Sequence, residues 1–369
     1  MIYLDHGATS FPKPAAVRKA VADSLVSHSN PGRGGYPAAM AASEGLFQCR
    51  EAAGKLFHCD PEQVVFTANC TQGLNMAIRT LVKPGDRVVV SGFEHNAVTR
   101  PLHLLGAEVL VAGRKLFDWD HTLTAFQQAL KQKPAAAVFT HVSNVFGYVL
   151  PVTEMAALCR EQGVPFVIDA AQSAGIFPVS MAELGADFIA MPGHKGLLGP
   201  MGTGILLCGR LPAPWLAGGT GSDSIKQEMP DFLPDRGEAG TANVPGIQGL
   251  LAGIRCVESM GLDNIRRREQ EQAQKCGEGL EKLGLRVFRG EHQGGTLSFL
   301  PAGDCEEWAA GLARQGVCLR AGLHCAPLAH ASAGTLETGT LRVSFGHDAH
   351  PSQTTGFLRA VSKLYLGKT

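Results

Sequence analysis

The stretch Met191-Pro192-Gly193-His194-Lys195 places a lysine in a glycine-containing turn, directly after the apolar run at residues 186–190. An earlier apolar run, at residues 165–168, is followed at once by an acid, Asp169. An enzyme that uses pyridoxal phosphate (PLP) needs a lysine amine for a Schiff base and a carboxylate that keeps the pyridine nitrogen protonated. A lysine one strand after an acid suits that chemistry. Gly-His-Lys alone is a weak signal, because most lysines are solvated surface charges.

The length and composition are those of an α/β enzyme. The chain has 369 residues, enough for two domains, and its 33 basic residues balance its 33 acidic residues. No net charge therefore favours nucleic acid or a membrane surface. Ten cysteines are scattered without a Cys-x-x-Cys pair, and neither a signal core nor an apolar run of membrane-spanning length occurs. We expect a cytoplasmic protein with reduced thiols and no nucleic-acid or membrane partner.

Short apolar runs alternate with helical patterns in the first two thirds of the chain. The expected strands are residues 64–67, 87–91, 108–111, 136–140, 165–168, 187–191 and 204–207. The expected helices are residues 71–81, 97–105 and 153–162, the last with Thr153 as its N-cap. Several strands are apolar on both faces, which is typical of buried strands. The alternation predicts an α/β fold with a mostly parallel central sheet flanked by helices.

The pattern changes after about Val244. Residues 246–283 are rich in helical patterns, and they precede a mixture of expected strands and helices: strands 285–288, 295–299 and 340–344, and helices 306–315 and 351–366. This mixture predicts a smaller α+β C-terminal domain. We therefore expect a large domain at residues 16–246 and a small domain at residues 247–369. The arm at residues 1–15 is too short to fold alone and is expected to pack on the small domain.

The segment at residues 67–73, Thr-Ala-Asn-Cys-Thr-Gln-Gly, joins an expected strand to an expected helix. Backbone N–H groups at a helix N-terminus, with a nearby hydroxyl such as that of Thr71, form a ready site for a phosphate. The alternative is a plain N-cap by Asn69 or Thr71, which needs no ligand.

Polar side chains follow several of the expected strands. They are Thr71, His95, Asn144, Asp169, Gln172, His194 and Lys195. In a parallel sheet, such positions gather at the one edge where ligands bind. His95 has the chemistry to stack on an aromatic cofactor and to shuttle protons. Each residue taken alone also has an ordinary reading, such as a loop histidine or a helix N-cap, but together they predict a cofactor site.

A cysteine near the C-terminal end of the chain is a candidate nucleophile. Cys325 follows His324 in a glycine-containing loop that begins near Arg320. Neighbouring positive charge lowers a thiol pKa and favours the thiolate, although a buried structural cysteine is the alternative. Arg342 could form a bidentate pair with a substrate carboxylate, and an ordinary ion pair is its alternative.

Together these residues resemble the cysteine desulfurases, in the class V aminotransferase group of fold-type I PLP enzymes. The resemblance runs almost end to end. Residues 2–9, Ile-Tyr-Leu-Asp-His-Gly-Ala-Thr, look like the family's opening motif, and Asn30-Pro31-Gly32-Arg33 looks like its substrate-side loop. The Arg-x-Gly-x-His-Cys-Ala pattern at residues 320–326 resembles the group II subclass.

The resemblance implies roles for the residues of the site. Lys195 would be the Schiff-base lysine, Asp169 would pair with the pyridine nitrogen, and Gln172 would contact the ring hydroxyl. His95 would stack on the ring. The implied phosphate contacts are Thr71, Gln72, His194 and, reaching from the neighbouring subunit of a homodimer, Thr241. The implied substrate-binding residues are Arg342 and Asn144, for the carboxylate, together with Asn30, Ala8 and Arg320.

The implied reaction converts L-cysteine to L-alanine. Lys195 or His95 would remove the Cα proton, and the thiolate of Cys325 would attack the substrate sulfur. The resulting persulfide would pass to an acceptor protein, as in iron–sulfur cluster assembly.

Three residues depart from the family pattern. Pro192 stands where Ser or Thr is usual, Leu323 replaces the first His of Gly-His-His-Cys, and His6 replaces Asn in the opening motif. The alternatives are a selenocysteine lyase, another class V aminotransferase activity, and a non-catalytic relative that keeps the fold. The spacing of His347 and His350 would also allow zinc binding, but solvated loop histidines are the simpler interpretation, and we predict no metal site.

Overall fold

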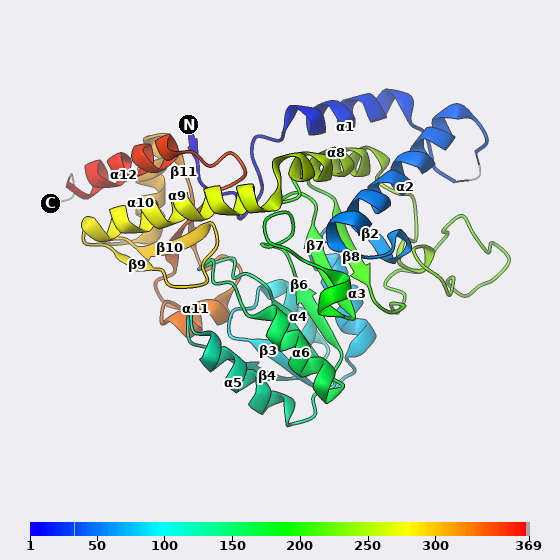
Figure 1. Ribbon diagram of the computed structural model, residues 1–369, viewed down its shortest axis with the longest axis horizontal. Coiled ribbons are helices and arrows are strands. Elements are labelled where there is room, and N and C mark those ends of the chain that lie inside the picture. The colour runs from blue at the N-terminus through cyan, green and yellow to red at the C-terminus, as the bar shows by residue number, and fades with distance from the viewer. Residues whose placement is uncertain (33, 367–369) are drawn as a thin grey trace.

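A seven-stranded sheet is the centre of the computed structural model, which describes residues 1–32 and 34–366 (Figure 1). Its strand order is β2-β8-β7-β6-β5-β3-β4. The strands are β2 (Val64–Thr67), β3 (Arg87–Ser91), β4 (Glu108–Ala112), β5 (Ala136–Thr140), β6 (Phe166–Asp169), β7 (Phe188–Pro192) and β8 (Gly204–Cys208). The pairs from β4 through β3, β5 and β6 to β7 are parallel, and β8 runs antiparallel to both β7 and β2. The predicted mostly parallel sheet is confirmed.

Helices cover both faces of this sheet because its strands are apolar on both sides. On one face, α3 (Cys70–Leu81) and α4 (Asn96–Leu104) bury apolar side chains such as Leu74 and Val98 against the sheet. The helices of the other face are α2 (Pro37–Phe57), α5 (Trp119–Leu130), α6 (Val152–Gln162) and α8 (Val244–Met260). A short helix, α7 (Met181–Leu184), and α1 (Ala15–Ser27), which packs on α8, complete this part of the chain (Figure 1).

A smaller antiparallel sheet, of order β12-β13-β10-β9, lies in the C-terminal third of the chain. Its strands are β9 (Arg286–Phe288), β10 (Thr296–Leu300), β12 (Arg320–Gly322) and β13 (Thr340–Ser344). The helices α9 (Leu262–Lys282), α10 (Cys305–Arg314) and α12 (Pro351–Leu366) pack with it around the buried Trp308, Phe299 and Phe357. A short helix, α11 (Pro327–Ala333), follows β12. The predicted small α+β unit is present.

The N-terminal arm lies against this smaller unit (Figure 1). Strand β1 (Ile2–Tyr3) pairs in parallel with β11 (Val317–Cys318), and the side chain of Leu4 is fully buried in the same core as Trp308. The arm then continues past the edge of the large sheet, where the Ser10 N–H donates to the His194 carbonyl oxygen. It therefore bridges the two sheets.

The expected division between residues 246 and 247 falls inside α8. The apolar side chains of Ile247, Leu250 and Ile254 pack in the core of the seven-stranded sheet. We therefore propose that the boundary between the two domains lies near Gly261, where α8 ends, because α8 then stays with the sheet on which it packs.

Several elements differ from the sequence-based expectations. Helix α6 begins at Val152 with Pro151 at the N-cap position, so the prediction that Thr153 is the N-cap was wrong. The patterns also did not reveal α1, α2 and α5 or the short helices α7 and α11; in α1 and α2 the apolar positions are interrupted by alanine and polar residues. Among the described residues, no helix has the length and apolar character needed to cross a membrane.

Candidate active site

The predicted convergence of polar residues is present in the structure. One cavity beyond the C-terminal ends of the parallel strands is lined by Thr71, His95, Asn144, Asp169, Gln172, His194 and Lys195. The sheet explains the arrangement, because β5, β6 and β7 are adjacent and parallel and so present their following residues at one edge. The site is therefore built by four loops and one helix start.

Lys195 and Asp169 come from neighbouring strand ends. Asp169 is the last residue of β6 and is 2% exposed, and its Oδ1 accepts hydrogen bonds from the Ala171 N–H (2.9 Å) and the Cys70 thiol (3.5 Å). Burial, and then the charge of Arg342, lower the pKa of the Lys195 amine below its usual value, while Asp169 opposes the shift. A lowered pKa gives a larger fraction of neutral amine, which is the nucleophilic form.

The start of α3 forms one wall of the cavity. Asn69, not Thr71, is the N-cap, since its Oδ1 accepts from the Gln72 N–H at 2.9 Å. The Gln72 side chain turns back to accept from the Ala68 N–H at 2.8 Å. The N–H groups of Cys70 and Thr71 are in the first turn, where an anion is favoured. Thr71 lines the lysine cavity.

A second cavity lies beside the first. Its lining includes Asn30, Gln72 and Thr241, so the structure separates these three residues from the cavity that contains Lys195. Thr241 is exposed on the surface of this chain. Arg33, at the end of the expected substrate-side loop, lies outside the described residues.

His95 is held as the N-cap of α4. Its Nδ1 accepts a hydrogen bond from the Ala97 N–H at 3.0 Å, so the proton of the neutral ring is on Nε2. Burial lowers the pKa of His95, which keeps the ring neutral at pH 7. In this state neither nitrogen has a lone pair free to accept a proton.

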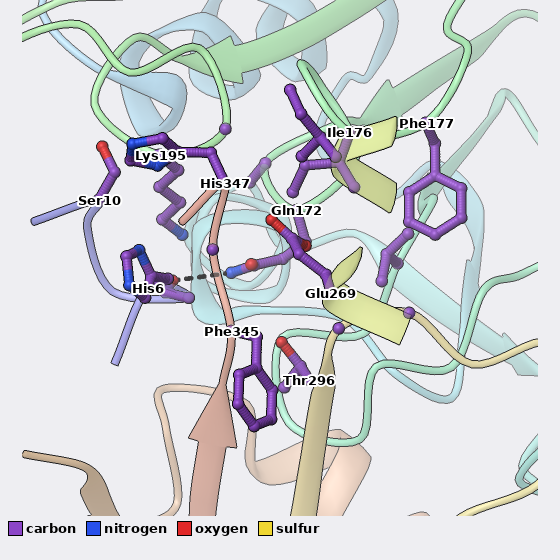
Figure 2. A pocket seen from close by; sticks show the side chains of 18 of the residues that line it. His6, Ser10, Gln172, Ile176, Phe177, Lys195, Glu269, Thr296, Phe345 and His347 are labelled. Carbon is purple, nitrogen blue, oxygen red and sulfur yellow. Dashed lines mark hydrogen bonds between the residues drawn. The ribbon is translucent and has the colours of Figure 1, made fainter. Parts of the chain in front are cut away.

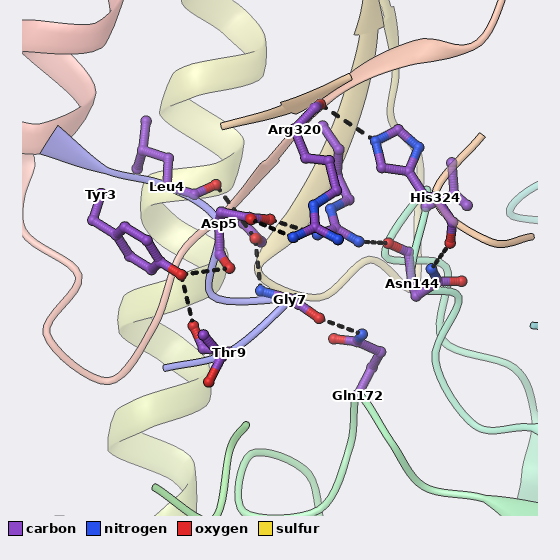
Figure 3. A network of polar contacts seen from close by, with 12 residues as sticks. Tyr3, Leu4, Asp5, Gly7, Thr9, Asn144, Gln172, Arg320 and His324 are labelled. Carbon is purple, nitrogen blue, oxygen red and sulfur yellow. Dashed lines mark hydrogen bonds and ion pairs between the residues drawn. The ribbon is translucent and has the colours of Figure 1, made fainter. Parts of the chain in front are cut away.

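The arm and the smaller sheet supply a polar network next to the cavity (Figure 3). The Arg342 guanidinium is buried, and its Nη2 pairs with Asp5 Oδ1 at 2.6 Å while its Nη1 donates to the Asn144 carbonyl oxygen at 3.0 Å. Arg320 pairs with the other carboxylate oxygen of Asp5 at 3.1 Å. Two guanidinium groups share one carboxylate, so the cluster keeps one uncompensated positive charge.

The same network uses the side-chain amide group of Asn144, so one N–H of this group is not free to donate a hydrogen bond to a substrate carboxylate. Its Nδ2 already donates to the His324 carbonyl oxygen at 2.8 Å. The buried Nε–H of Arg342, in contrast, has no partner within the part of the chain that the structure describes. An unpaired buried donor on a cation is costly, and a ligand carboxylate would satisfy it.

Gln172 and His194 contact the arm as well as lining the cavity. The Gln172 Nε2 donates to the Gly7 carbonyl oxygen at 3.0 Å (Figure 3), and His194 Nδ1 lies 3.1 Å from the Thr9 hydroxyl. Ala8, between these two arm residues, closes a turn by donating its N–H to the Asp5 carbonyl oxygen. Burial, aided by Lys195, lowers the pKa of His194 to about 4, so the ring is neutral near pH 7.

Cys325 is exposed on the loop between β12 and α11 and is not part of the cavity wall. His324 and Cys325 both have positive φ angles, 51° and 55°, and their carbonyl oxygens accept from Asn144 Nδ2 and from the Asn96 N–H. The loop is therefore anchored to residues that flank the site. Strain of this kind is common where a loop carries chemistry.

His324 does not supply the positive charge that the sequence suggested. Its ring stacks on His330 with centroids 5.7 Å apart, and its Nε2 lies 3.3 Å from the Arg320 carbonyl oxygen. Burial, and then the charge of Arg342, lower its pKa to about 3. His324 is thus neutral at pH 7 and acts as a packed loop residue.

The residues present fit PLP. Asp169 is buried and receives only two neutral donors, which leaves a carboxylate suited to a cationic pyridinium. The amine of Lys195 and the first turn of α3 face the same cavity, and they match an aldehyde and a phosphate respectively.

Sequence reasoning did not identify the arm residues Asp5, Gly7 and Thr9 as part of the site. Their backbone and side-chain contacts to residues more than 100 positions away leave no local pattern. The opening motif was the one signal available, because it resembles a family motif in a segment too short to fold alone.

Comparisons with known proteins give a consistent result. The aminotransferase class-V family model matches residues 2–354. A probable cysteine desulfurase of Pyrococcus abyssi is 32% identical over 349 residues, which cover 88% of this chain and 85% of that protein. A cysteine desulfurase of Escherichia coli O1:K1 / APEC is 31% identical over 346 residues, covering 88% and 84% of the two chains.

Solved structures agree with these relatives. The apo structure of a cysteine desulfurase from Thermococcus onnurineus NA1 has a TM-score of 0.90 and 30% identity, covering 99% of this chain and 95% of that one. The E. coli cysteine desulfurase CsdA, in an S-sulfonic acid form, has a TM-score of 0.84 and 28% identity, with coverage of 99% and 95%.

Proposed function

Because the chain belongs to the class-V aminotransferase family, a family of PLP enzymes, we propose that it is a PLP-dependent cysteine desulfurase. The proposed reaction converts L-cysteine to L-alanine and leaves the sulfur as a persulfide on Cys325. One observation carries the proposal: Lys195 and Asp169 face one cavity, and the Cys325 loop is bonded to residues beside it.

In this proposal Lys195 would hold PLP covalently, Asp169 would pair with the ring nitrogen, and His95 would stack on the ring. The start of α3, Thr71 and His194 would hold the phosphate, with Gln72 on the adjoining wall, and Gln172 would contact the ring hydroxyl. When bound, the cofactor accepts the electrons released at Cα of the substrate.

The substrate carboxylate is proposed to bind at Arg342. The unpartnered Nε–H and the surplus positive charge of the Arg342, Arg320 and Asp5 cluster support this assignment. Asn144 positions the cluster through its carbonyl oxygen and the Cys325 loop through its side chain. Asn30 and Ala8 would shape the approach to the site from the surface.

Lys195 is the proposed base that would remove the Cα proton, after the amine of the substrate has replaced the Lys195 amine on the cofactor. Its lowered pKa and its place on the cavity wall suit that role. His95 is a poor candidate, because its Nδ1 lone pair accepts the Ala97 N–H and its Nε2 carries the proton. We therefore propose that His95 acts through its ring face.

Cys325 is the proposed sulfur acceptor within the enzyme. Its thiolate attacks the substrate sulfur, so that an S–S bond forms as the Cβ–S bond breaks, and the carbon fragment is protonated and leaves as alanine. The exposure of Cys325 suits the next step, in which a thiol of an acceptor protein takes the sulfur. The ten free cysteines of the chain fit a reducing compartment, which we propose to be the cytoplasm.

The first test is the absorbance spectrum of the purified protein before and after addition of L-cysteine, with alanine and sulfide quantified. We expect a PLP band that changes on addition of cysteine, together with equal amounts of alanine and sulfide under reducing conditions. A PLP band with little sulfide would contradict the proposal; turnover of selenocysteine would then indicate a lyase, and a keto-acid requirement would indicate an aminotransferase. A protein that never takes up PLP would indicate a non-catalytic relative.

The Cys325→Ala variant tests the persulfide step. We expect it to keep the PLP band and its response to cysteine, and to lose at least ~100-fold in sulfide release, since no thiolate remains to receive the sulfur. Cys318→Ala is the matched control, because Cys318 is a half-buried cysteine of the neighbouring strand β11. Equal rates for the two variants would remove Cys325 from the mechanism.

A further inference from the structure

Three metal-binding side chains meet beside the lysine cavity, and the proposed desulfurase reaction uses none of them. His6 comes from the arm, while His347 and Asp348 come from the loop between β13 and α12. One ligand atom from each residue lies within 4.8 Å of the others. Figure 2 shows His6 and His347 on the same side of the cavity as Lys195.

The contacts within this cluster are not those of a hydrogen-bonded pair. His6 is 6% exposed, yet both of its ring nitrogens lack a hydrogen-bond partner among the described residues, as does the buried Nδ1 of His347. The His6 Nε2 lies 3.4 Å from Asp348 Oδ1 without meeting hydrogen-bond geometry. Buried polar atoms are seldom left without partners, so these nitrogens require an explanation.

A shared metal ion accounts for the Nε2 of His6, which is unpaired within the described part of the chain, and for its short separation from Asp348 Oδ1. Two ligand atoms on a tetrahedral zinc ion, with bonds of about 2.0–2.1 Å, are about 3.3 Å apart. The separation of His6 Nε2 and Asp348 Oδ1, 3.4 Å, agrees with this distance. Each of the two rings offers a buried nitrogen without a hydrogen-bond partner among the described residues, Nε2 of His6 and Nδ1 of His347.

We propose that His6, His347 and Asp348 form a zinc site that ties the N-terminal arm to the β13–α12 loop. Two imidazoles and one carboxylate are a donor set that zinc accepts, with the fourth position open to water. None of the three residues is among the PLP contacts assigned above, although His6 and His347 line the same cavity as Lys195 and Gln172.

The surrounding charges are compatible with a divalent cation. Asp348 supplies one negative charge. Glu269 lines the same cavity as His6 and His347 (Figure 2), but burial raises the pKa of its carboxyl well above the usual value and so favours the uncharged form. Lys13 is the opposing charge, but its ammonium is engaged by the Ser10 hydroxyl and the His194 carbonyl oxygen, each at 2.7 Å.

Space and access also suit the site. A Cβ atom on Gly346 would lie 2.1 Å from His6 Nδ1, so only glycine leaves room for this ring. The Asp348 side chain is 41% exposed, and His347 also lines a surface groove with Pro14 and Met260, which gives a route for the ion. His350, which the sequence paired with His347, is instead bonded to Ser352 and lies outside the cluster.

A metal ion at this site would fix the position of the N-terminal arm. Gly7, which follows His6, accepts the hydrogen bond from Gln172, and its N–H donates to the Ser344 hydroxyl at 2.7 Å. An ion on His6 would therefore hold the arm in place where it meets the cofactor cavity.

The test is zinc retention by the PLP-loaded enzyme. Chelator-treated and desalted protein is incubated with Zn²⁺, desalted again, and analysed for zinc per chain. We expect about one zinc per chain for the wild type and about a tenth or less for His6→Asn and for Asp348→Asn, since each variant loses one of three protein ligands. His350→Ala is the matched control and should retain as much zinc as the wild type.

The atoms bound to the zinc show whether it occupies the proposed site or binds adventitiously to the cysteines. Zinc-edge X-ray absorption of the loaded wild type should show only nitrogen and oxygen neighbours at about 2.0–2.1 Å, whereas cysteine ligation would add sulfur at about 2.3 Å. The proposal is overturned if the wild type retains no zinc, if His6→Asn retains as much as His350→Ala, or if sulfur dominates the shell. These results do not depend on desulfurase activity, so the two proposals can fail separately.

Discussion

At the scale of single residues, the hydrogen bonds of His95 decide between two chemical roles. A histidine beside a cofactor is usually considered as a proton carrier, since its ordinary pKa is near neutrality. Here the backbone N–H of Ala97 uses the Nδ1 lone pair, and burial keeps the ring neutral. The ring face remains available, and the basic lone pair does not.

Two substitutions of His95 separate its ring face from its capping bond. His95→Phe keeps an aromatic face but loses the N-cap, while His95→Asn keeps a capping side chain but loses the ring. We expect His95→Phe to exchange the Cα proton of alanine at a rate within ~10-fold of the wild-type rate. We expect His95→Asn to bind PLP up to ~10-fold more weakly, because it loses the free energy of one aromatic contact. Exchange followed by NMR in deuterated buffer is the measurement, with Lys195→Ala as the variant that abolishes it. If the Phe variant were as inactive as Lys195→Ala, His95 would be the base.

At the scale of helices and strands, the sequence predicted the cavity because each of its main residues closely follows a strand that can be recognised from its own short apolar run. Thr71, Asp169 and Lys195 each follow an apolar run. Parallel pairing of β6 with β7 brings Asp169 and Lys195 together. Strand β2 is separated from β7 by the antiparallel β8 and so points the same way as β7, which brings Thr71 to the same edge. The direction of β8 was not predictable, since an apolar run reads the same in either direction. The pairing of Asp5 with Arg342 was also out of reach, because it joins residues 337 positions apart.

The ends of β3 and β5 are joined by a buried acid, Glu94. Its Oε1 accepts from the Ser91 N–H and hydroxyl and from the Thr140 N–H, while its Oε2 is buried without a partner among the described residues. Burial raises the pKa of Glu94 to about 8. The folded protein thus holds a proton here that the unfolded chain releases near its ordinary pKa of about 4.3.

This proton makes stability depend on pH in a defined direction. Between pH ~4.3 and about 8 the folded state binds more protons than the unfolded state, so the contribution of Glu94 to stability falls as pH rises, by up to ~1.4 kcal/mol per unit. Glu94→Gln keeps the accepting oxygen and removes the titration. We expect the melting temperature of the wild type, relative to Glu94→Gln, to decline from pH 5.5 to 8.5. The exposed Glu161→Gln should follow the wild type, and a constant offset between wild type and Glu94→Gln would contradict the assignment.

At the scale of the whole molecule, a short arm bridges the two sheets, in addition to direct contacts such as that of the Ser298 hydroxyl with the Val145 carbonyl oxygen. The seven-stranded sheet carries the lysine, the acid and the start of α3, whereas the smaller sheet carries Arg342 and the Cys325 loop. Motion of one unit against the other would separate the cofactor from the substrate-binding charges. The arm spans both units, which is why residues 5–9 contact so many groups of the site (Figure 3).

Within a single chain, Thr241 does not line the cavity that contains Lys195. The homodimer implied by the family resemblance would bring Thr241 of one subunit to the site of the other. Thr241 is exposed and lines the second cavity, while apolar side chains of α1 and α2, among them Val26, Met40 and Phe47, are exposed on the same molecule. Exposed apolar side chains of this size suit an interface between subunits. In a two-fold dimer each Thr241 would then reach the phosphate bound by its partner.

Mixed dimers can show whether Thr241 acts across the interface. Lys195→Ala lacks the cofactor lysine, and Thr241→Val should weaken PLP binding ~10-fold or more by removing a hydrogen bond to a charged group. After the two variants are unfolded, mixed in equal amounts and refolded at limiting PLP, half of the dimers would be mixed. Each mixed dimer would combine the intact Lys195 of one chain with the intact Thr241 of the other in one of its two sites, so sulfide release should recover to about a quarter of the wild-type rate. If Thr241 served its own chain, no site in the mixture would hold both residues, and the activity would stay at the average of the two parents.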